Sequence, residues 1–428
     1  MKKTAILSSS LLSIALLAVA CAGGNDDVSE EPDPVEPIEQ LSGTWEGEIE
    51  VPVQPLSISI HLDGDQASLS IPIQGLQEQP FDSVDISEDR LQLEMNLQGQ
   101  SLLFEGERTE EKIEGIFTQM GQELPFYLLE KEFEDLVELE MEAGTMKAKV
   151  DMPDLDEPVP VALIIAGSGP TDKHGNSPLL PGRNDNLKLL AEGLNEAGIA
   201  TIRYDKRGVG DNTQLVSNPE EVVFDDFVND ARAWIQYALT DERFSTVHIV
   251  GHSEGALIGK LVAKDIEVDS YTSLAGAGQT IDRILLDQIS ADPTFPLPLL
   301  NEAAAIFDQL RAGELVEEMS LELEPIFHVS SQPFLLSWMA YDPQEVIVSL
   351  DTNILLVNGT NDLQIPESEA ELLHEANPDS ELFIVEGMGH ALRETPEDAE
   401  GNVATASQPD TPLAEGLIKK VAEHILKD

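Results

Sequence analysis

A serine that could act as a nucleophile stands at the centre of the sequence Gly-His-Ser-Glu-Gly, residues 251–255. The sequence Val-His-Ile-Val at residues 247–250 predicts a strand before it, and residues 254–264 predict a helix after it. Glycines let the backbone turn sharply from strand to helix, and such a turn lifts the serine hydroxyl clear of the sheet. The helix N-terminus favours negative charge that develops beside this hydroxyl. We therefore predict that Ser253 is a nucleophile.

A serine hydroxyl becomes nucleophilic when a histidine takes its proton and a carboxylate orients that histidine. A serine on a strand-to-helix turn is followed along the chain by the acid and then by the histidine. The histidines after the serine are His328, His374, His390 and His424. Only His390 lies in a glycine loop just beyond a predicted strand, residues 382–385, from which an imidazole can reach the serine. His390 is therefore the predicted base.

The acid of this set should follow the preceding strand. Residues 354–357 predict that strand, and the turn after it ends at Asp362. Two other aspartates, Asp342 and Asp351, come before the strand and so lie on its wrong side. Asp362 is therefore the predicted partner of His390.

A second glycine-rich loop, Ala-Gly-Ser-Gly-Pro at residues 166–170, follows a continuous apolar run over residues 161–166. Loops of this kind expose backbone N–H groups, and one such group can act with the N–H after the nucleophile to hold an oxyanion. By position, these donors are the backbone amides of Ser168 and Glu254. A phosphate-binding loop is excluded, since no Gly-Lys-Ser/Thr sequence follows.

Three stretches of the chain together resemble a known enzyme family: residues 165–172 (Ile-Ala-Gly-Ser-Gly-Pro-Thr-Asp), residues 203–210 (Arg-Tyr-Asp-Lys-Arg-Gly-Val-Gly) and the serine motif. They are similar to α/β-hydrolases of the serine-aminopeptidase-like group, in which bacterial esterases with an extra N-terminal domain occur. The resemblance covers about the C-terminal two-thirds of the chain and does not extend to the part before it. It implies the α/β-hydrolase fold.

The resemblance also implies Ser253 as nucleophile, Asp362 as acid and His390 as base, with no metal or organic cofactor. No set of histidines, cysteines and carboxylates in the sequence has the spacing of metal ligands. The favoured reaction is hydrolysis of carboxylic esters with small to medium acyl chains through an acyl-enzyme. An amidase or aminopeptidase is the alternative, and it would need an acidic anchor for the substrate amine. A non-catalytic binding protein would lack a triad member, and none is missing.

Strand and helix patterns alternate from about residue 135 onward, as in a mostly parallel sheet. The apolar run over residues 161–166 is typical of a strand buried on both faces. A mainly helical stretch, about 279–345, interrupts this alternation and is predicted to be an inserted cap that would suit modest acyl chains. We therefore predict an α/β-hydrolase catalytic domain over residues 133–428 with a helical cap.

The preceding part, residues 41–132, has apolar residues at every second position, as in residues 56–62 and 91–97. Short half-buried strands separated by glycine and aspartate turns are typical of an antiparallel sandwich or barrel. No set of chemically reactive residues converges here. We predict a small antiparallel all-β domain that is a structural module or grips the substrate.

The N-terminus has the features of an export signal: two lysines, an apolar run and small residues directly before Cys21. Residues 1–20 followed by this cysteine resemble the signal peptide of bacterial lipoproteins, in which the cysteine is acylated. Residues 21–40 form an acidic, proline-containing tether. We expect an extracytoplasmic protein, anchored through a lipid on Cys21 to a bacterial membrane, at its periplasmic side or the cell surface.

The chain of 428 residues carries 24 lysines and arginines against 81 aspartates and glutamates, which gives a formal net charge of −57. Nucleic-acid binding needs clustered cations, so this composition argues against nucleic acid as a partner. Hydrophobic residues make up 41% of the chain, which is enough for a packed core. The expected partners are a small-molecule ester or amide and the membrane.

Overall fold

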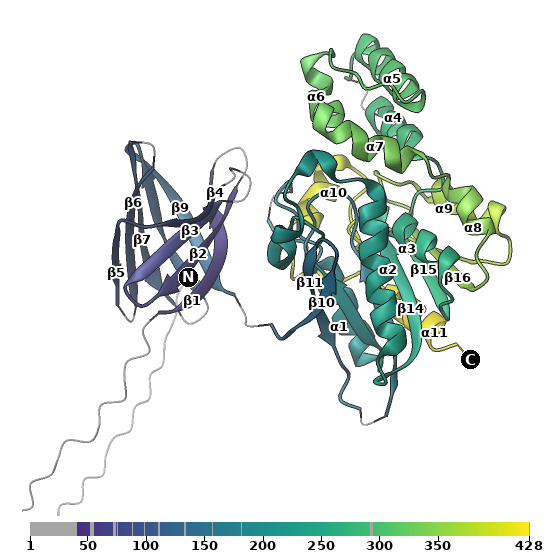
Figure 1. Cartoon of the computed structure of the whole chain (residues 1–428), viewed down its shortest axis with the longest axis horizontal. Helices are drawn as coiled ribbons and strands as arrows, with labels where there is room; N and C mark the ends of the chain where they lie inside the picture. Colours follow the sequence, from purple (N-terminus) through teal and green to yellow (C-terminus); the bar gives the residue numbers. More distant parts are fainter. Residues whose placement is uncertain are drawn as a thin grey trace, which may run out of the picture.

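Figure 1 shows the protein as a computed structural model. The structure describes residues 41–427, apart from residues 52–54, 72–73, 75, 88, 98, 110–111, 132–133, 156, 181 and 292–293. The predicted signal peptide, the tether and the predicted lipidation site Cys21 lie outside the described residues. The described residues form two β-sheets that follow one another along the chain.

The first sheet is antiparallel throughout, as predicted, and contains nine strands. These strands are β1 Gly43–Ile49, β2 Leu56–Asp63, β3 Gln66–Ile71, β4 Leu76–Pro80, β5 Ser83–Ile86, β6 Arg90–Leu97, β7 Gln100–Arg108, β8 Lys112–Gln119 and β9 Gln122–Glu130. Their order is β4-β3-β2-β1-β9-β8-β7-β6-β5, so the first strand pairs with the last and joins two runs of hairpins.

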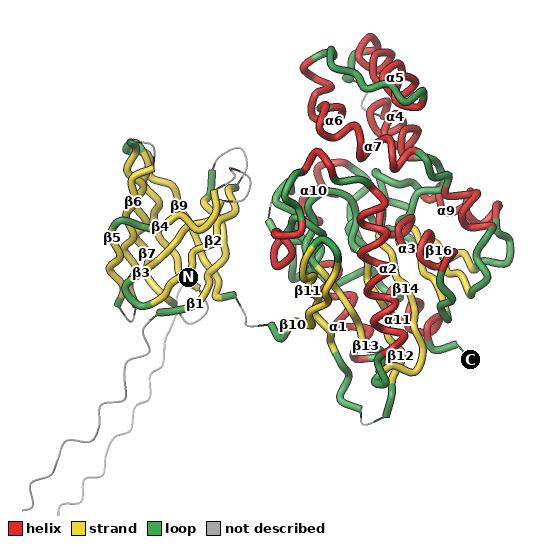
Figure 2. The backbone as a smooth tube through the Cα atoms, in the orientation of Figure 1, coloured by secondary structure: helices red, strands yellow, loops and turns green. Residues whose placement is uncertain are grey.

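One face of this sheet is buried because apolar side chains alternate along its strands. In β2, for example, Ile58, Ile60 and Leu62 are buried while the residues between them are half-buried or exposed. Buried side chains from across the sheet form a single cluster that includes Trp45 and Phe104. The backbone of this sheet is curled (Figure 2). Among the described residues of this part, one apolar face belongs to one curled sheet, and no second sheet is stacked on it.

The second sheet has eight strands and is mostly parallel. Its strands are β10 Leu136–Met141, β11 Gly144–Asp151, β12 Val159–Ile165, β13 Ala200–Tyr204, β14 Phe244–His252, β15 Ser270–Leu274, β16 Asn353–Gly359 and β17 Glu381–Val385. The order is β10-β11-β13-β12-β14-β15-β16-β17, in which only β10 and β11 run antiparallel to their neighbours. The carboxyl ends of β12, β14, β16 and β17 therefore point to the same edge of the sheet.

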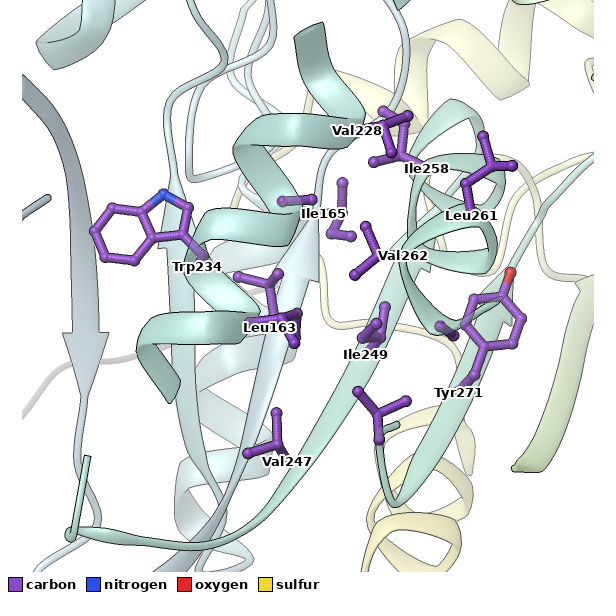
Figure 3. Close-up of a cluster of buried hydrophobic side chains, with 14 of the residues drawn as sticks. Leu163, Ile165, Val228, Trp234, Val247, Ile249, Ile258, Leu261, Val262 and Tyr271 are labelled. Atoms are coloured by element: carbon purple, nitrogen blue, oxygen red, sulfur yellow. The ribbon is translucent and has the colours of Figure 1, made fainter. Parts of the chain in front are cut away.

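Helices cover both faces of this sheet. Outside the cap they are α1 Asn186–Glu196, α2 Phe224–Thr240, α3 Glu254–Asp265, α9 Glu367–Ala376, α10 Ala399–Ala406 and α11 Leu417–Ile425. Leu163 and Ile165 of β12 pack in one cluster with α2 and α3, where Trp234 is fully buried (Figure 3). Ile164, between them, packs in a second cluster with α1 and α11. The continuous apolar run of β12 thus contributes buried side chains to the hydrophobic clusters on both faces of the sheet.

A helical cap is inserted between β15 and β16, as predicted (Figure 1). Its helices are α4 Ile281–Ala291, α5 Leu297–Arg311, α6 Glu324–Phe327, α7 Gln332–Met339 and α8 Pro343–Val348. Phe307 and Phe327 lie at the centre of a hydrophobic cluster formed within the cap, with ring centroids 4.7 Å apart. Across residues 41–427, as far as they are described, no helix is long and apolar enough to cross a membrane.

Candidate active site

Ser253 lies on a strained turn between β14 and α3. Its backbone has φ 55° and ψ −119°, a conformation that costs a non-glycine residue about 1–3 kcal/mol. The turn also brings α3 close to β12, because a Cβ atom on Gly255 would lie 2.3 Å from the carbonyl oxygen of Ile165. A Cβ on Gly251 would lie equally close to the carbonyl oxygen of Gly255. Only glycine fits at either position, which explains the Gly-x-Ser-x-Gly spacing.

Three predicted site residues form one series of hydrogen bonds at the carboxyl edge of the sheet. His390 follows β17, and its Nε2 atom is 3.1 Å from Oγ of Ser253. The other ring nitrogen, Nδ1, is 2.8 Å from Oδ2 of Asp362, which follows β16. The second carboxylate oxygen of Asp362 accepts the backbone N–H groups of Gln364 and Ile365 at 2.9 and 2.8 Å. Asp362 is therefore fixed in the orientation that holds the imidazole toward the serine.

His252, beside the serine, adds a contact that the sequence did not predict. Its Nε2 atom is 2.9 Å from the backbone carbonyl oxygen of His390. Burial, and then the neighbouring His390, lower the pKa of the His252 side chain to about 4. The ring is therefore neutral at pH 7, and its Nε2–H donates to the carbonyl. This hydrogen bond ties the loop that carries His390 to the turn that carries Ser253.

The loop after β12 packs directly against Ser253. A Cβ atom on Gly167 would lie 3.2 Å from Cβ of Ser253, so the backbone of the loop passes close to the serine. Ser168, the next residue, lines the pocket that opens at Ser253. Ser168 and Glu254 therefore lie next to Ser253 on two different segments, the loop after β12 and the start of α3.

The far end of the same loop is held by Asp172. Its Oδ1 atom accepts the backbone N–H groups of His174 and Asn176, each at 2.8 Å. Burial, followed by the charge of Asp205, raises the pKa of Asp172 to about 6. Among the described residues, neither Asp172 nor His174 lines the pocket at Ser253. Their contacts stabilise the conformation of the loop, away from the pocket.

A pocket of about 370 Å³ opens at Ser253 and His390. Small and uncharged residues make up most of its lining, and no aspartate or glutamate is found among the described residues that line it. Arg393 also lines it, but this guanidinium is fully buried and donates to Asn184 and to the carbonyl of Thr411. The pocket therefore offers a substrate hydrogen-bonding groups without a free charge.

Large apolar side chains stand at the edge of this pocket. Leu179, Leu180, Leu363 and Val403 all line it, and about half of each side chain remains exposed to solvent. They come from three segments: the loop before α1, the turn after Asp362, and α10. Together they form an apolar rim that could contact part of a substrate extending out of the pocket.

The helical cap does not contribute to the pocket among the described residues. The aromatic side chains at its end pack on α2 instead, where Trp338 stacks on Phe224 with ring centroids 5.2 Å apart. The segment that lines the pocket is α10, through Ala399, Asn402 and Val403. The expectation that the cap accommodates the acyl chain therefore shifts to α10, for which the sequence analysis predicted no element.

The comparison with protein families assigns this fold. A model described as "Alpha/beta hydrolase family" matches residues 174–401, more than half of the chain. The protein belongs to this family. Esterase EstD of Thermotoga maritima is 24% identical to it over 267 residues, which cover 61% of this chain and 61% of the esterase. The chain thus matches less than two-thirds of the length of that relative.

Solved structures of similar fold are more distant. Est1E from Butyrivibrio proteoclasticus, with bound ferulic acid, has 18% sequence identity and a TM-score of 0.44, and the match covers 68% of this chain and 96% of that one. The esterase domain of a Rhodothermus marinus protein has 15% identity and a TM-score of 0.39, with 65% and 98% covered.

Two buried side chains of this alpha/beta hydrolase contact loops of the site through partners that the sequence did not identify. His252 and Lys206 are both buried, and each hydrogen-bonds a backbone carbonyl of another loop at the site, His390 and Gly167 respectively. Their position inside the motifs at residues 251–255 and 203–210 was the only signal available. The partners of these side chains lie far away along the chain, so spacing could not reveal them.

Proposed function

We propose that this alpha/beta hydrolase cleaves carboxylic esters of small to medium acyl chains through an acyl-enzyme on Ser253. The observation that carries the proposal is the hydrogen-bonded series Ser253–His390–Asp362, which opens on a pocket without an acidic side chain. The similarity to an esterase supports the reaction class. We also place the chain in the serine-aminopeptidase-like group, on the sequence motifs alone.

In the proposed mechanism, Nε2 of His390 takes the proton of Ser253 as its oxygen attacks the ester carbonyl. The carbonyl oxygen becomes an oxyanion, which accepts hydrogen bonds from the backbone amides of Ser168 and Glu254. The C–O bond to the alcohol then breaks, and His390 returns the proton to the leaving oxygen. Water repeats the sequence on the acyl-enzyme and releases the acid, while Asp362 stabilises the imidazolium each time.

The pocket also narrows the substrate class. An aminopeptidase needs a carboxylate to bind the substrate's N-terminal amine, and none lines the pocket among the described residues. Glu254, the nearest acid in the chain, is buried, and its Oε1 accepts a hydrogen bond from Nζ of Lys206 at 2.6 Å. We therefore favour an uncharged ester whose apolar part contacts the rim formed by Leu179, Leu180, Leu363 and Val403.

The test compares the full-length wild type with Ser253→Ala on p-nitrophenyl acetate, butyrate and hexanoate, and on alanine p-nitroanilide. We expect ester turnover in the wild type and a loss of at least about 10⁴-fold in the variant. We expect the wild type to leave the anilide uncleaved. Anilide turnover without ester turnover would favour the aminopeptidase. No turnover together with no labelling of Ser253 by a fluorophosphonate would refute catalysis by this serine.

We further propose that the protein is exported and anchored to the membrane through an acylated Cys21. The support is the N-terminal sequence alone, with its lysines, apolar run and small residues before the cysteine. Cells expressing the full-length chain would be fed an alkyne-bearing fatty acid, and label would be sought on the protein. We expect label on the wild type and none on Cys21→Ala; an unlabelled, freely released wild type would contradict the anchor.

A further inference from the structure

Lys206 is a buried cation placed between the two segments that flank Ser253. It follows β13, and only 4% of its surface is exposed. Its Nζ atom donates to the backbone carbonyl oxygen of Gly167 at 3.0 Å and to Oε1 of Glu254 at 2.6 Å. One ammonium group thus contacts both the loop after β12 and the first residue of α3.

These two contacts bear directly on the two amides assigned to the oxyanion. The carbonyl of Gly167 and the N–H of Ser168 belong to the same peptide group, which is planar and trans. A hydrogen bond that fixes the carbonyl oxygen therefore also fixes the direction of the N–H on the opposite side. The second contact holds the side chain of Glu254, whose own backbone N–H is the other donor. Lys206 can thus set the spacing between the two donors.

The surroundings of Lys206 hold the ammonium in place. Nζ lies 4.5 Å from the centre of the Phe227 ring on α2, a distance at which a cation is attracted to the face of an aromatic ring. The backbone N–H of Lys206 donates to the carbonyl of Thr171 at 3.3 Å. The hydroxyl of Thr171 in turn donates to the carbonyl of Ser168 at 3.0 Å. The loop is therefore tied to Lys206 at both of its ends.

A buried ion pair is weak evidence of stability, because removing two charges from water offsets much of their attraction. What the pair of Lys206 and Glu254 does provide is direction, since each hydrogen bond fixes a distance and an angle. Oxyanion donors must match the reacting oxygen closely, and a displacement of about 1 Å can lower turnover by about 100-fold. A rigid link at this place would serve catalysis more than it serves folding.

We propose that Lys206 is a positioning residue: its ammonium links the Gly167 carbonyl to the Glu254 carboxylate and so holds the amides of Ser168 and Glu254 at the spacing of an oxyanion hole. The inference rests on the proposed function, since it assigns a task within the same reaction. It adds a residue that never touches the substrate but determines how well the transition state is bound.

The test uses Lys206→Met in the full-length protein, which removes the ammonium and keeps a side chain of similar length. We expect kcat on p-nitrophenyl butyrate to fall by about 10- to 100-fold, with KM within about threefold of the wild type. The inhibition constant of 1,1,1-trifluorohexan-2-one, which binds serine as a tetrahedral adduct, should rise by a similar factor. Lys206→Arg, which keeps a cation, should recover part of both losses.

Lys260→Met is the matched control. Lys260 is likewise buried, on α3, but among the described residues its Nζ donates a hydrogen bond only to the carbonyl of Pro343, at 3.5 Å. Its loss should leave kcat and the inhibition constant within about threefold of the wild type. A Lys206→Met protein with wild-type kcat, or with a lowered kcat and unchanged inhibitor binding, would overturn the inference.

Two further outcomes separate this inference from the proposed function. If Lys206→Met does not fold, the test uses Glu254→Gln, which keeps an acceptor for the ammonium, and Glu254→Ala, which does not. Glu254→Gln should retain more activity than Glu254→Ala. Equal losses would show that the contact between Lys206 and residue 254 does not matter for turnover. The rate at which a fluorophosphonate labels Ser253 provides a reading that needs no ester. If the wild type and Lys206→Met are labelled equally fast, the positioning role alone is refuted. If the wild type is not labelled, the serine mechanism is refuted and the inference with it.

Discussion

The helical cap and the short helix α10 lie in the same part of the chain, the part that carries Ser253, and they differ in what they do. The cap spans α4 to α8 and has a hydrophobic cluster of its own, with Phe307 and Leu310 fully buried. Helix α10 has no buried residue. Nevertheless it is α10 that lines the pocket at Ser253, while no described cap residue does so. The size of such a segment therefore does not tell how close it lies to the chemistry.

The two segments leave the sheet at the same edge and differ in what they pack against. The segment that contains α10 follows His390, whose ring contacts both Ser253 and Asp362, so the segment begins at the site. The cap leaves the sheet after β15, and its last helices pack on the outside of α2 and α3, where Phe334 and Trp338 contact the cluster of the sheet core. The cap therefore leaves the sheet at the same carboxyl edge as the loops of the site, and Gln288 of α4 donates to the backbone carbonyl of Gln364 at 2.9 Å, yet no described cap residue lines the pocket.

The largest effect should come from filling the pocket at α10. Ala406 lines it, and Ala406→Phe would occupy space that a longer acyl chain needs. We expect kcat/KM for p-nitrophenyl hexanoate to fall by about 100-fold relative to the acetate ester. The control is the same substitution on the cap, Ala305→Phe, at an exposed position of α5. A change in acyl preference with Ala305→Phe but not with Ala406→Phe would show that the cap, and not α10, contacts the acyl chain.

The attachment of the α10 segment at its start can be weakened through His252. Replacing it with phenylalanine removes the hydrogen bond to the carbonyl of His390, and we expect kcat to fall by about tenfold while KM changes little. His248→Phe is the control, because this histidine is also buried on β14 but bonds Ser270 and Thr246 instead. Equal losses of kcat in both variants would show that any buried histidine of the strand matters, and the anchoring role would be wrong.

A defect inside the cap should affect stability more than catalysis. Phe307→Ala removes the centre of the cap cluster, where the ring packs edge-on against Phe327, and we expect a loss of about 3–5 kcal/mol in the free energy of unfolding of the cap. The kcat/KM for p-nitrophenyl acetate should remain within about threefold at a temperature where circular dichroism shows the folded state. Urea denaturation gives the stability, and Phe307→Leu should lie between the two proteins. A tenfold loss of activity in a folded Phe307→Ala protein would contradict this prediction, because it would show that the packing of the cap affects catalysis.

The stability of the junction of the cap with the sheet domain should depend on pH. Burial lowers the pKa of Lys260 to about 7, while the unfolded chain binds this proton up to about pH 10.5. Below pH 7 both states carry the charge and its burial cost is fully present. Between pH 7 and 10.5 the unfolded state binds more protons, so the wild type gains stability relative to Lys260→Met as pH rises. Urea unfolding of both proteins from pH 6.5 to 10 measures this, and a difference independent of pH would contradict the shifted pKa.

Much of the second sheet could be predicted because its strands are continuous apolar runs. Two elements were not predicted. The strand β15, Ser-Tyr-Thr-Ser-Leu, is buried at every position yet largely polar, and its Ser270 hydroxyl is 2.8 Å from Nδ1 of His248 on the neighbouring strand. Helix α10 consists mostly of small residues without an apolar period. In both cases the stabilising partners come from elsewhere in the chain, and local sequence does not contain them.

The sequence by itself determined which residues could do chemistry, because a nucleophile turn needs glycines at fixed places and an acid and a base need loops after strands. Ser253, Asp362 and His390 follow from these local requirements. Only the tertiary structure decided which segment lines the pocket, and that Lys206 and His252 reach the loops of the site. The reason is that the carboxyl ends of parallel strands meet at one edge, so that contacts there join residues more than a hundred positions apart in the chain, such as Ser253 and His390.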